Sequence, residues 1–150
     1  MEEKEILKEY RKTRVEAFGT IKECTELLQE HEDADLYYKR AMATILVGSY
    51  SGGFNKEFSL TYLDVEKVKP ILEDFKQAKL LKPSCLDYIK EETLFLFNYT
   101  YSYEYESIYD ITYKDIICTN CKEILEQEPD NDTFISILNL IQTSKHFYSS

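Results

Sequence analysis

A CxxC pair, Cys118-Thr119-Asn120-Cys121, is the arrangement in this sequence that comes closest to reactive chemistry. Two thiols at this spacing can do redox work when they open a helix, and they can hold zinc when two further ligands lie near. Here the pair falls inside a segment with helical periodicity, no strand precedes it, and acidic neighbours raise the pKa of a thiol. We therefore expect buried core thiols, with a metal site or redox chemistry as the alternatives.

Other groups that could do catalysis are isolated. The only two histidines, His31 and His146, fall near expected helix ends, where a surface or capping role is the ordinary one. No serine has an adjacent base, and no glycine-rich phosphate loop is present, since Ser51-Gly52-Gly53 is typical of a turn. The sequence predicts a protein that is not an enzyme, with no catalytic residues, no metal and no cofactor.

Composition indicates one folded domain over residues 1–150. Apolar residues make up 43% of the 150 residues and charged residues 31%, which is ordinary for a folded domain able to bury a core. The net charge of −10 repels phosphate backbones and anionic lipids. We therefore expect no nucleic-acid partner and no membrane partner, and a neutral or basic protein or peptide is favoured.

The cysteines and the first residues predict a cytoplasmic protein. Cys24, Cys85, Cys118 and Cys121 are too few and too dispersed for a small fold held by disulfides, so reduced thiols are expected. The sequence opens with charged residues that no apolar run follows, which argues against a secretory signal. No apolar stretch has the length of a membrane span.

Apolar residues recur at helical spacing along most of the chain. This periodicity predicts helices over 3–30, 36–47, about 69–81, 107–127 and 132–147. The third is expected to begin near Lys69, because Pro70 fits only the first turn of a helix. Residues 54–63 alternate between apolar and polar side chains and favour a strand.

Residues 86–106 support two interpretations. Aromatic residues fall at every second position, which is a strand pattern: Phe95, Phe97, Tyr99, Tyr101, Tyr103 and Tyr105. The same segment also carries a helical stripe through Leu94, Phe97, Tyr101, Tyr105 and Ile108. We predict an all-α fold of about six helices in antiparallel hairpins. The alternative is an α+β fold with a three-stranded antiparallel sheet from 43–50, 56–63 and 93–105.

A weak internal repeat supports the helical hairpins. Asp35-Leu36-Tyr37-Tyr38-Lys39 is similar to Asp87-Tyr88-Ile89-Lys90, and an amphipathic segment that closes on Pro83 or Pro129 follows each copy. Phe75-x2-Ala78-x4-Pro83 resembles the second-helix half of a tetratricopeptide repeat, with the match best over 70–83 and 109–131. The chain departs from the family in two ways. It has no tryptophan, and its two prolines, Pro83 and Pro129, are 46 residues apart, whereas the family repeat is 34 residues long. The resemblance implies stacked helix pairs that bind a partner in a groove.

The predicted function is to bind a protein or peptide as an adaptor or regulatory module. The candidate anchors are tyrosines expected on the first helix of each of the two hairpins: Tyr38, Tyr50, Tyr101 and Tyr105. Tyrosine suits this role because it offers apolar area and a hydroxyl together. Acidic runs at the expected helix junctions, Glu30 to Asp35 and Glu126 to Asp132, could attract a basic partner. The alternative is a small acidic immunity protein of α+β fold that neutralises a toxin.

Overall fold

The computed structural model describes residues 3–48, 65–102, 107–108 and 111–146, and the side chains of 14–47, 68–101 and 112–144. The chain divides into two compact units, Met1–Cys85 (unit 1) and Leu86–Ser150 (unit 2). The prediction of a single domain over 1–150 stays a prediction.

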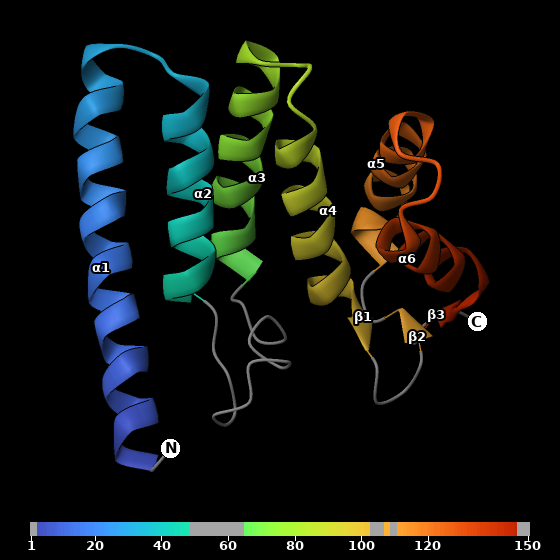
Figure 1. Ribbon diagram of the computed structural model, residues 1–150, viewed down its shortest axis with the longest axis horizontal. Coiled ribbons are helices and arrows are strands. Elements are labelled where there is room, and N and C mark those ends of the chain that lie inside the picture. Colours follow the sequence, from blue (N-terminus) through green and yellow to red (C-terminus); the bar gives the residue numbers. More distant parts are fainter. Residues whose placement is uncertain (1–2, 49–64, 103–106, 109–110, 147–150) are drawn as a thin grey trace. The chain divides into compact units, whose positions relative to one another are not determined.

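The described part of unit 1 consists of three helices that pack in sequence order. They are α1 (Glu3–Glu30), α2 (Ala34–Gly48) and α3 (Val65–Leu81). α1 packs along α2 and α2 along α3, so α2 is the central helix of the unit (Figure 1). Asp33 stands at the N-cap of α2, where its carboxylate accepts hydrogen bonds from the backbone N–H groups of Asp35 (2.8 Å) and Leu36 (3.3 Å).

The core of unit 1 is made of small and branched residues from the facing sides of these helices. α3 contributes a stripe at helical spacing, in which Val68, Ile71, Phe75 and Ala78 have no exposed surface. Ala41, Ala43 and Ile45 of α2 and Ala17 and Cys24 of α1 are also buried. Small side chains on α1 and α2 let the helices approach closely, and the aromatic ring of Phe75 fills the space between α2 and α3.

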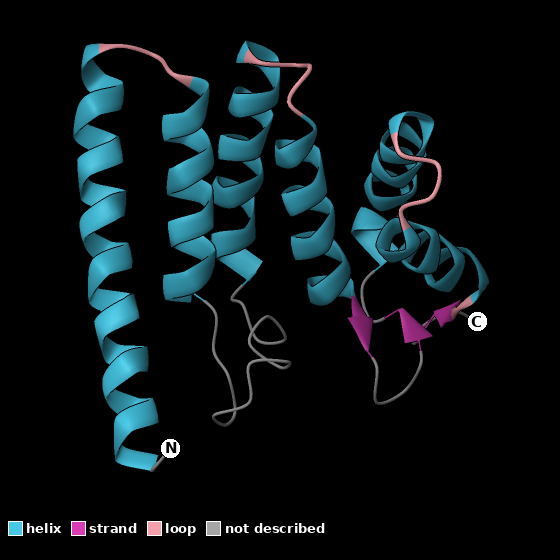
Figure 2. Ribbon diagram, viewed as in Figure 1, coloured by secondary structure: helices cyan, strands magenta, loops and turns pink. Residues whose placement is uncertain are grey.

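Within its described residues, unit 2 contains three helices and three very short strands. The helices are α4 (Leu86–Thr100), α5 (Lys114–Gln127), preceded by the 3-10 turn η2 (Ile111–Tyr113), and α6 (Asp132–Thr143). The strands are β1 (Tyr101–Ser102), β2 (Ser107–Ile108) and β3 (Lys145–His146) (Figure 2). β2 pairs antiparallel with β1 and parallel with β3. α5 packs on both α4 and α6.

The structure confirms the all-α fold of helical hairpins. The α+β alternative is wrong for residues 43–48 and 93–100, which are helical, and of its third strand only Tyr101 and Ser102 are extended, in β1. Residues 49–50, 56–63 and 103–105 of that proposed sheet lie outside the described residues. The alternation in α4 misleads because this helix is buried on most of its circumference, so Phe95 and Phe97 are both in the core although they point to different sides.

The start of α3 also differs from the prediction. The helix begins at Val65, so Pro70 lies within it, on its exposed side. Proline has no N–H, so the carbonyl of Glu66 has no intrahelical donor at that position.

Neither unit contains, among its described residues, a helix with both the length and the apolar character needed to cross a bilayer.

Candidate functional site

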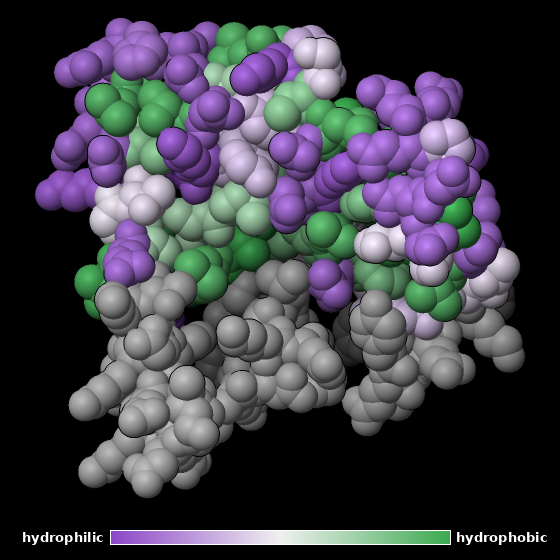
Figure 3. Space-filling view, in the orientation of Figure 1, coloured by the Kyte–Doolittle hydropathy of each residue, from purple (hydrophilic) through white to green (hydrophobic). Residues whose placement is uncertain are grey.

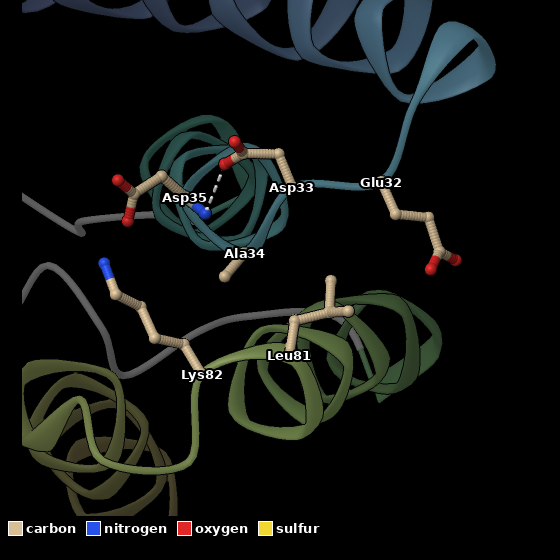
Figure 4. Close-up of a pocket in the computed structure, with 6 residues that line it drawn as sticks. All are labelled: Glu32, Asp33, Ala34, Asp35, Leu81 and Lys82. Atoms are coloured by element: carbon tan, nitrogen blue, oxygen red, sulfur yellow. Dashed lines mark hydrogen bonds between the residues drawn. The ribbon is translucent and has the colours of Figure 1, made fainter.

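A recess of about 380 Å³ opens in unit 1 where the ends of its helices meet. We call it the acidic recess. Its lining comes from the α1–α2 connection and the end of α3: Glu32, Asp33, Ala34, Asp35, Leu81 and Lys82 (Figure 4). Hydrophilic side chains gather over this end of unit 1, with apolar side chains beside them at the end of α3 (Figure 3). The recess therefore combines three carboxylates and one ammonium with an apolar wall.

Packing of α2 against α3 explains why the recess forms. Ala34 and Tyr38 lie one turn apart on the side of α2 that faces α3, and Tyr38 packs edge-on against Phe75 with ring centroids 6.3 Å apart. Beyond Tyr38 the small side chain of Ala34 no longer fills the space. Leu81 is 44% exposed there and its neighbour Leu80 is 63% exposed. The buried apolar stripe of α3 therefore ends before Leu81.

Two of the carboxylates are held in place by hydrogen bonds. Asp33 caps α2, and Glu32 accepts a hydrogen bond from the hydroxyl of Tyr37 at 3.2 Å. Burial, followed by the neighbouring Glu32 carboxylate, raises the pKa of the Tyr37 hydroxyl. Asp35 and Lys82 extend to one side of the recess, while Glu32 lies on the other (Figure 4). Negative charge here also suits the N-terminus of α2.

A partly buried ion pair ties the three helices together beneath the recess. Arg40 donates to Asp74 twice, from Nε to Oδ2 at 2.9 Å and from Nη2 to Oδ1 at 2.7 Å. Its Nη1 donates to the hydroxyl of Thr25 on α1 at 3.3 Å, and its guanidinium lies 5.7 Å from the ring centre of Tyr37. The bond to Asp74 raises the pKa of Arg40. One side chain of α2 thus reaches α1, α3 and the tyrosine that holds Glu32.

Tyr38 and Tyr101 hold different positions among the predicted anchors. Tyr38 is half-buried beside the acidic recess. Tyr101 belongs to the core of unit 2, where it is 7% exposed and stacks on Phe97 with ring centroids 5.0 Å apart, so its ring is not available to a partner. Tyr50 and Tyr105 lie outside the described residues. Sequence reasoning missed Tyr37, Arg40 and Asp74, although a carboxylate within the apolar stripe of α3 is itself a signal of a buried ion pair.

The CxxC pair lies in α5, as the periodicity suggested. Cys121 is fully buried and Cys118 is half-buried, and all four cysteines are free. Burial raises the pKa of the Cys121 thiol to about 12, which keeps it protonated near neutral pH. Between the two cysteines, Asn120 is also buried and donates to Glu92 of α4 at 2.8 Å. No group of three or more His, Cys, Asp or Glu side chains that could hold a metal ion occurs among the described residues.

Unit 2 has a second ion pair, at the end of α5. Lys90 donates to Glu128 at 2.8 Å, and Asn131 donates to the same carboxylate at 2.9 Å. The bond from Lys90, with a smaller contribution from Asn131, lowers the pKa of Glu128. These contacts join the start of α4 to the α5–α6 turn.

Comparisons with family models, with curated proteins and with solved structures found no match for this chain.

Proposed function

We propose that this protein is a non-enzymatic binding module, and that a neutral or basic protein or peptide binds at the acidic recess of unit 1. The observation that carries the proposal is the joining of three carboxylates to an exposed apolar wall in one recess. A partner that presents a Lys or Arg beside an aliphatic side chain would match both features.

Charge and packing support this choice of partner. The net charge of −10 attracts a basic partner over a distance and repels an acidic one, which favours rapid association. Leu80 and Leu81 supply apolar area that the fold itself does not bury. Since Asp33 and Glu32 are already held by hydrogen bonds, little side-chain entropy is lost when a cation approaches them.

Tyr38 is a predicted anchor that lies beside this site. It stands one turn from Ala34 on the same side of α2, so a partner that enters the recess can reach the edge of its ring. The roles of Tyr50 and Tyr105 stay predictions. The pairing of α2 with α3 and of α4 with α5 is compatible with tetratricopeptide-like hairpins, which we retain as part of the proposal.

A cytoplasmic location also belongs to this proposal, because four free cysteines suit a reducing compartment. The toxin-neutralising alternative depended on the α+β fold and stays a prediction without further support.

The test is selection from a random peptide library on the immobilised full chain. We expect the selected peptides to be rich in Lys or Arg next to Leu or Ile. Their affinity, measured by fluorescence anisotropy, should fall about tenfold or more in a Glu32→Gln, Asp35→Asn double variant, and it should rise in Lys82→Gln. Asp33 is left unchanged because it caps α2.

Two exposed acidic residues of α5 provide the matched control. The double variant Glu123→Gln, Glu126→Gln removes the same charge from unit 2 and should bind the selected peptides almost as well as the wild type. Selected peptides without a positive bias would contradict the proposal, and so would equal losses in the two double variants.

A further inference from the structure

The hairpins α2–α3 and α4–α5 place a polar contact between their helices at equivalent positions. Arg40 is the seventh residue of α2, and its partner Asp74 lies seven residues before the end of α3. Glu92 is likewise the seventh residue of α4, and its partner Asn120 lies seven residues before the end of α5. α2 and α4 also have the same length, 15 residues each. Each hairpin therefore pairs its two helices in the same register.

The second helices of the two hairpins also match in their core and in the turn that follows. Moving the buried positions 71, 74, 75 and 78 of α3 forward by 46 residues, the separation of the two prolines, gives the four buried residues of α5: Ile117, Asn120, Cys121 and Ile124. After α3, the N–H of Cys85 donates to the carbonyl of Lys82 at 3.1 Å, and after α5 the N–H of Asn131 donates to the carbonyl of Glu128 at 3.1 Å. Lys82 and Glu128 are therefore equivalent residues, each directly after its helix and before a proline.

The shared register brings different side chains to the two hairpin ends. In unit 1, α2 begins with Ala34, Tyr38 follows one turn later, and Lys82 directly follows α3. The short side chain of Ala34 belongs to the wall of the acidic recess and leaves space between α2 and the end of α3 (Figure 4). In unit 2 the three equivalent positions carry a larger aliphatic residue, a cation and an anion: Leu86, Lys90 and Glu128.

Lys90 spans the corresponding place in unit 2. Its Nζ lies 2.8 Å from Oε2 of Glu128, so its alkyl chain crosses from α4 to the residue that follows α5. Asn131 donates to the other oxygen of the same carboxylate at 2.9 Å and fixes its orientation. Leu86 stands one turn before Lys90 on the same side of α4. A cation beside an aliphatic side chain thus occupies this hairpin end, and it is the same pair of groups that the acidic recess offers to accept from a partner.

We propose that unit 2 holds a closed counterpart of the acidic recess, in which Leu86 and Lys90 take the place that an aliphatic and a basic residue of the partner take in unit 1. This inference rests on the proposed function and adds two statements to it. The identities of residues 34, 38 and 82 decide that the recess of unit 1 is open. Each chain therefore binds one partner, at unit 1.

Ala34→Leu should close the recess without changing any charge. The introduced side chain, which unit 2 has at the equivalent position, displaces the aliphatic group of the partner. The Kd of the tightest library peptide, labelled with fluorescein and measured by anisotropy, should therefore rise about tenfold or more. Ala34→Ser is the matched control, because it keeps the small size of the side chain and should leave the Kd within about twofold. Both variants should keep the wild-type circular dichroism spectrum, because Ala34 is not in the core.

The ion pair of unit 2 provides a test in which charge and closure act in opposite directions. Tyr38→Lys adds one positive charge and Lys82→Glu exchanges a positive for a negative charge, so the double variant carries a net charge of −11 instead of −10. This change alone should tighten the binding of a basic peptide. If the introduced lysine pairs with the introduced glutamate, as Lys90 pairs with Glu128, the Kd should instead rise about tenfold.

Tyr38→Met with Lys82→Glu is the matched control for this variant. It loses the same contact between Tyr38 and Phe75 and introduces a chain of similar length, but it has no ammonium that could close the recess. The control should therefore bind the peptide about tenfold more tightly than Tyr38→Lys with Lys82→Glu. Ala34→Leu leaves Tyr38 in place, so it tests closure even if the double variants unfold.

Isothermal titration calorimetry of the wild-type chain should give one peptide per chain. Two equal sites would overturn the inference, and so would an Ala34→Leu variant that binds as tightly as Ala34→Ser. A third contradicting outcome is a Kd in Tyr38→Lys with Lys82→Glu that is no higher than in the wild type. All three leave the proposed function standing, whereas a wild-type chain that selects no basic peptides would overturn the proposed function and this inference together.

Discussion

Removing one partner of the Arg40–Asp74 ion pair should strongly destabilise unit 1. The two side chains are joined by two hydrogen bonds, and their exposed fractions are 25% for Arg40 and 9% for Asp74. Asp74→Leu would leave a half-buried guanidinium without the acceptor for its Nε and Nη2. Arg40→Met would leave a carboxylate in the core without its cation.

The burial of the pair sets the expected magnitude. Exposed ion pairs contribute about 0.2–1 kcal/mol, whereas breaking a fully buried pair costs about 3–5 kcal/mol. Since Asp74 is nearly buried and Arg40 is one quarter exposed, we expect each single substitution to lower the free energy of unfolding by about 2–3 kcal/mol. The double variant leaves no unpaired charge and should lose only about 0–1 kcal/mol, because an apolar pair of similar volume can replace a buried ion pair.

Urea unfolding followed by circular dichroism at 222 nm measures these changes. The two compact units can unfold in separate transitions, so the transition of unit 1 is identified as the one that Phe75→Ala shifts. The double-mutant cycle then gives the coupling energy between Arg40 and Asp74, which we expect to be about 3 kcal/mol or more.

The Lys90–Glu128 pair of unit 2 is the matched control. Its N–O distance is 2.8 Å against 2.7 Å, and Lys90 is 24% exposed, much like Arg40, but Glu128 is 40% exposed. If burial of the carboxylate decides the energy, the coupling in this pair should be far smaller. Equal coupling energies in the two cycles, or single substitutions at Arg40 and Asp74 that cost less than about 0.5 kcal/mol, would refute the reasoning.

Three further predictions concern the core of unit 2. Cys121 should resist iodoacetamide at neutral pH until the chain unfolds. Its pKa is about 12 in the folded state against 9.0 in the unfolded state, so between these values only the unfolded state loses the thiol proton, and the free energy of unfolding should fall by about 1.4 kcal/mol per pH unit. A Cys121→Ala variant with an equally steep pH dependence of stability would contradict this. Asn120→Ala should lower the free energy of unfolding by about 1–3 kcal/mol in urea, because the buried Glu92 carboxylate loses a hydrogen bond, and a change below about 0.5 kcal/mol would show that this bond is dispensable. Thr100→Val should raise the melting temperature, with a gain of about 1 kcal/mol, because the buried hydroxyl has no hydrogen-bond partner among the described residues; a loss of stability would reveal one.

Helices with one apolar side were predictable from the sequence. The spacing of Ala17, Cys24 and Leu28 indicated α1, and Phe134, Ile137 and Ile141 indicated α6, because a helix with a single core-facing side leaves a clear 3.6-residue period. α4 was ambiguous for the opposite reason. A helix surrounded by core carries apolar residues on several sides, so its period is weak and alternation can arise by coincidence.

The candidate site was only partly predictable. The acidic run from Glu30 to Asp35 was recognised, and the structure adds that the run borders a recess. The opposing residues Leu81 and Lys82 come from a helix about fifty residues later in the sequence, and periodicity within one segment carries no information about which distant helix end lies opposite. For the same reason the partner of Arg40 could not be identified before Asp74 was placed next to it.

Pro70 divides α3 into two parts that should open at different rates. The turn from Val65 to Lys69 has one backbone bond fewer than an uninterrupted helix and contributes Val68 to the core, whereas the following residues are anchored there by Ile71, Asp74 and Phe75. Amide hydrogens of the first turn should therefore exchange with deuterium by local fraying, and those beyond Asp74 only when unit 1 unfolds. Fraying at the start of α3 can thus occur while the end of the helix stays folded, so the recess keeps its shape during this local opening.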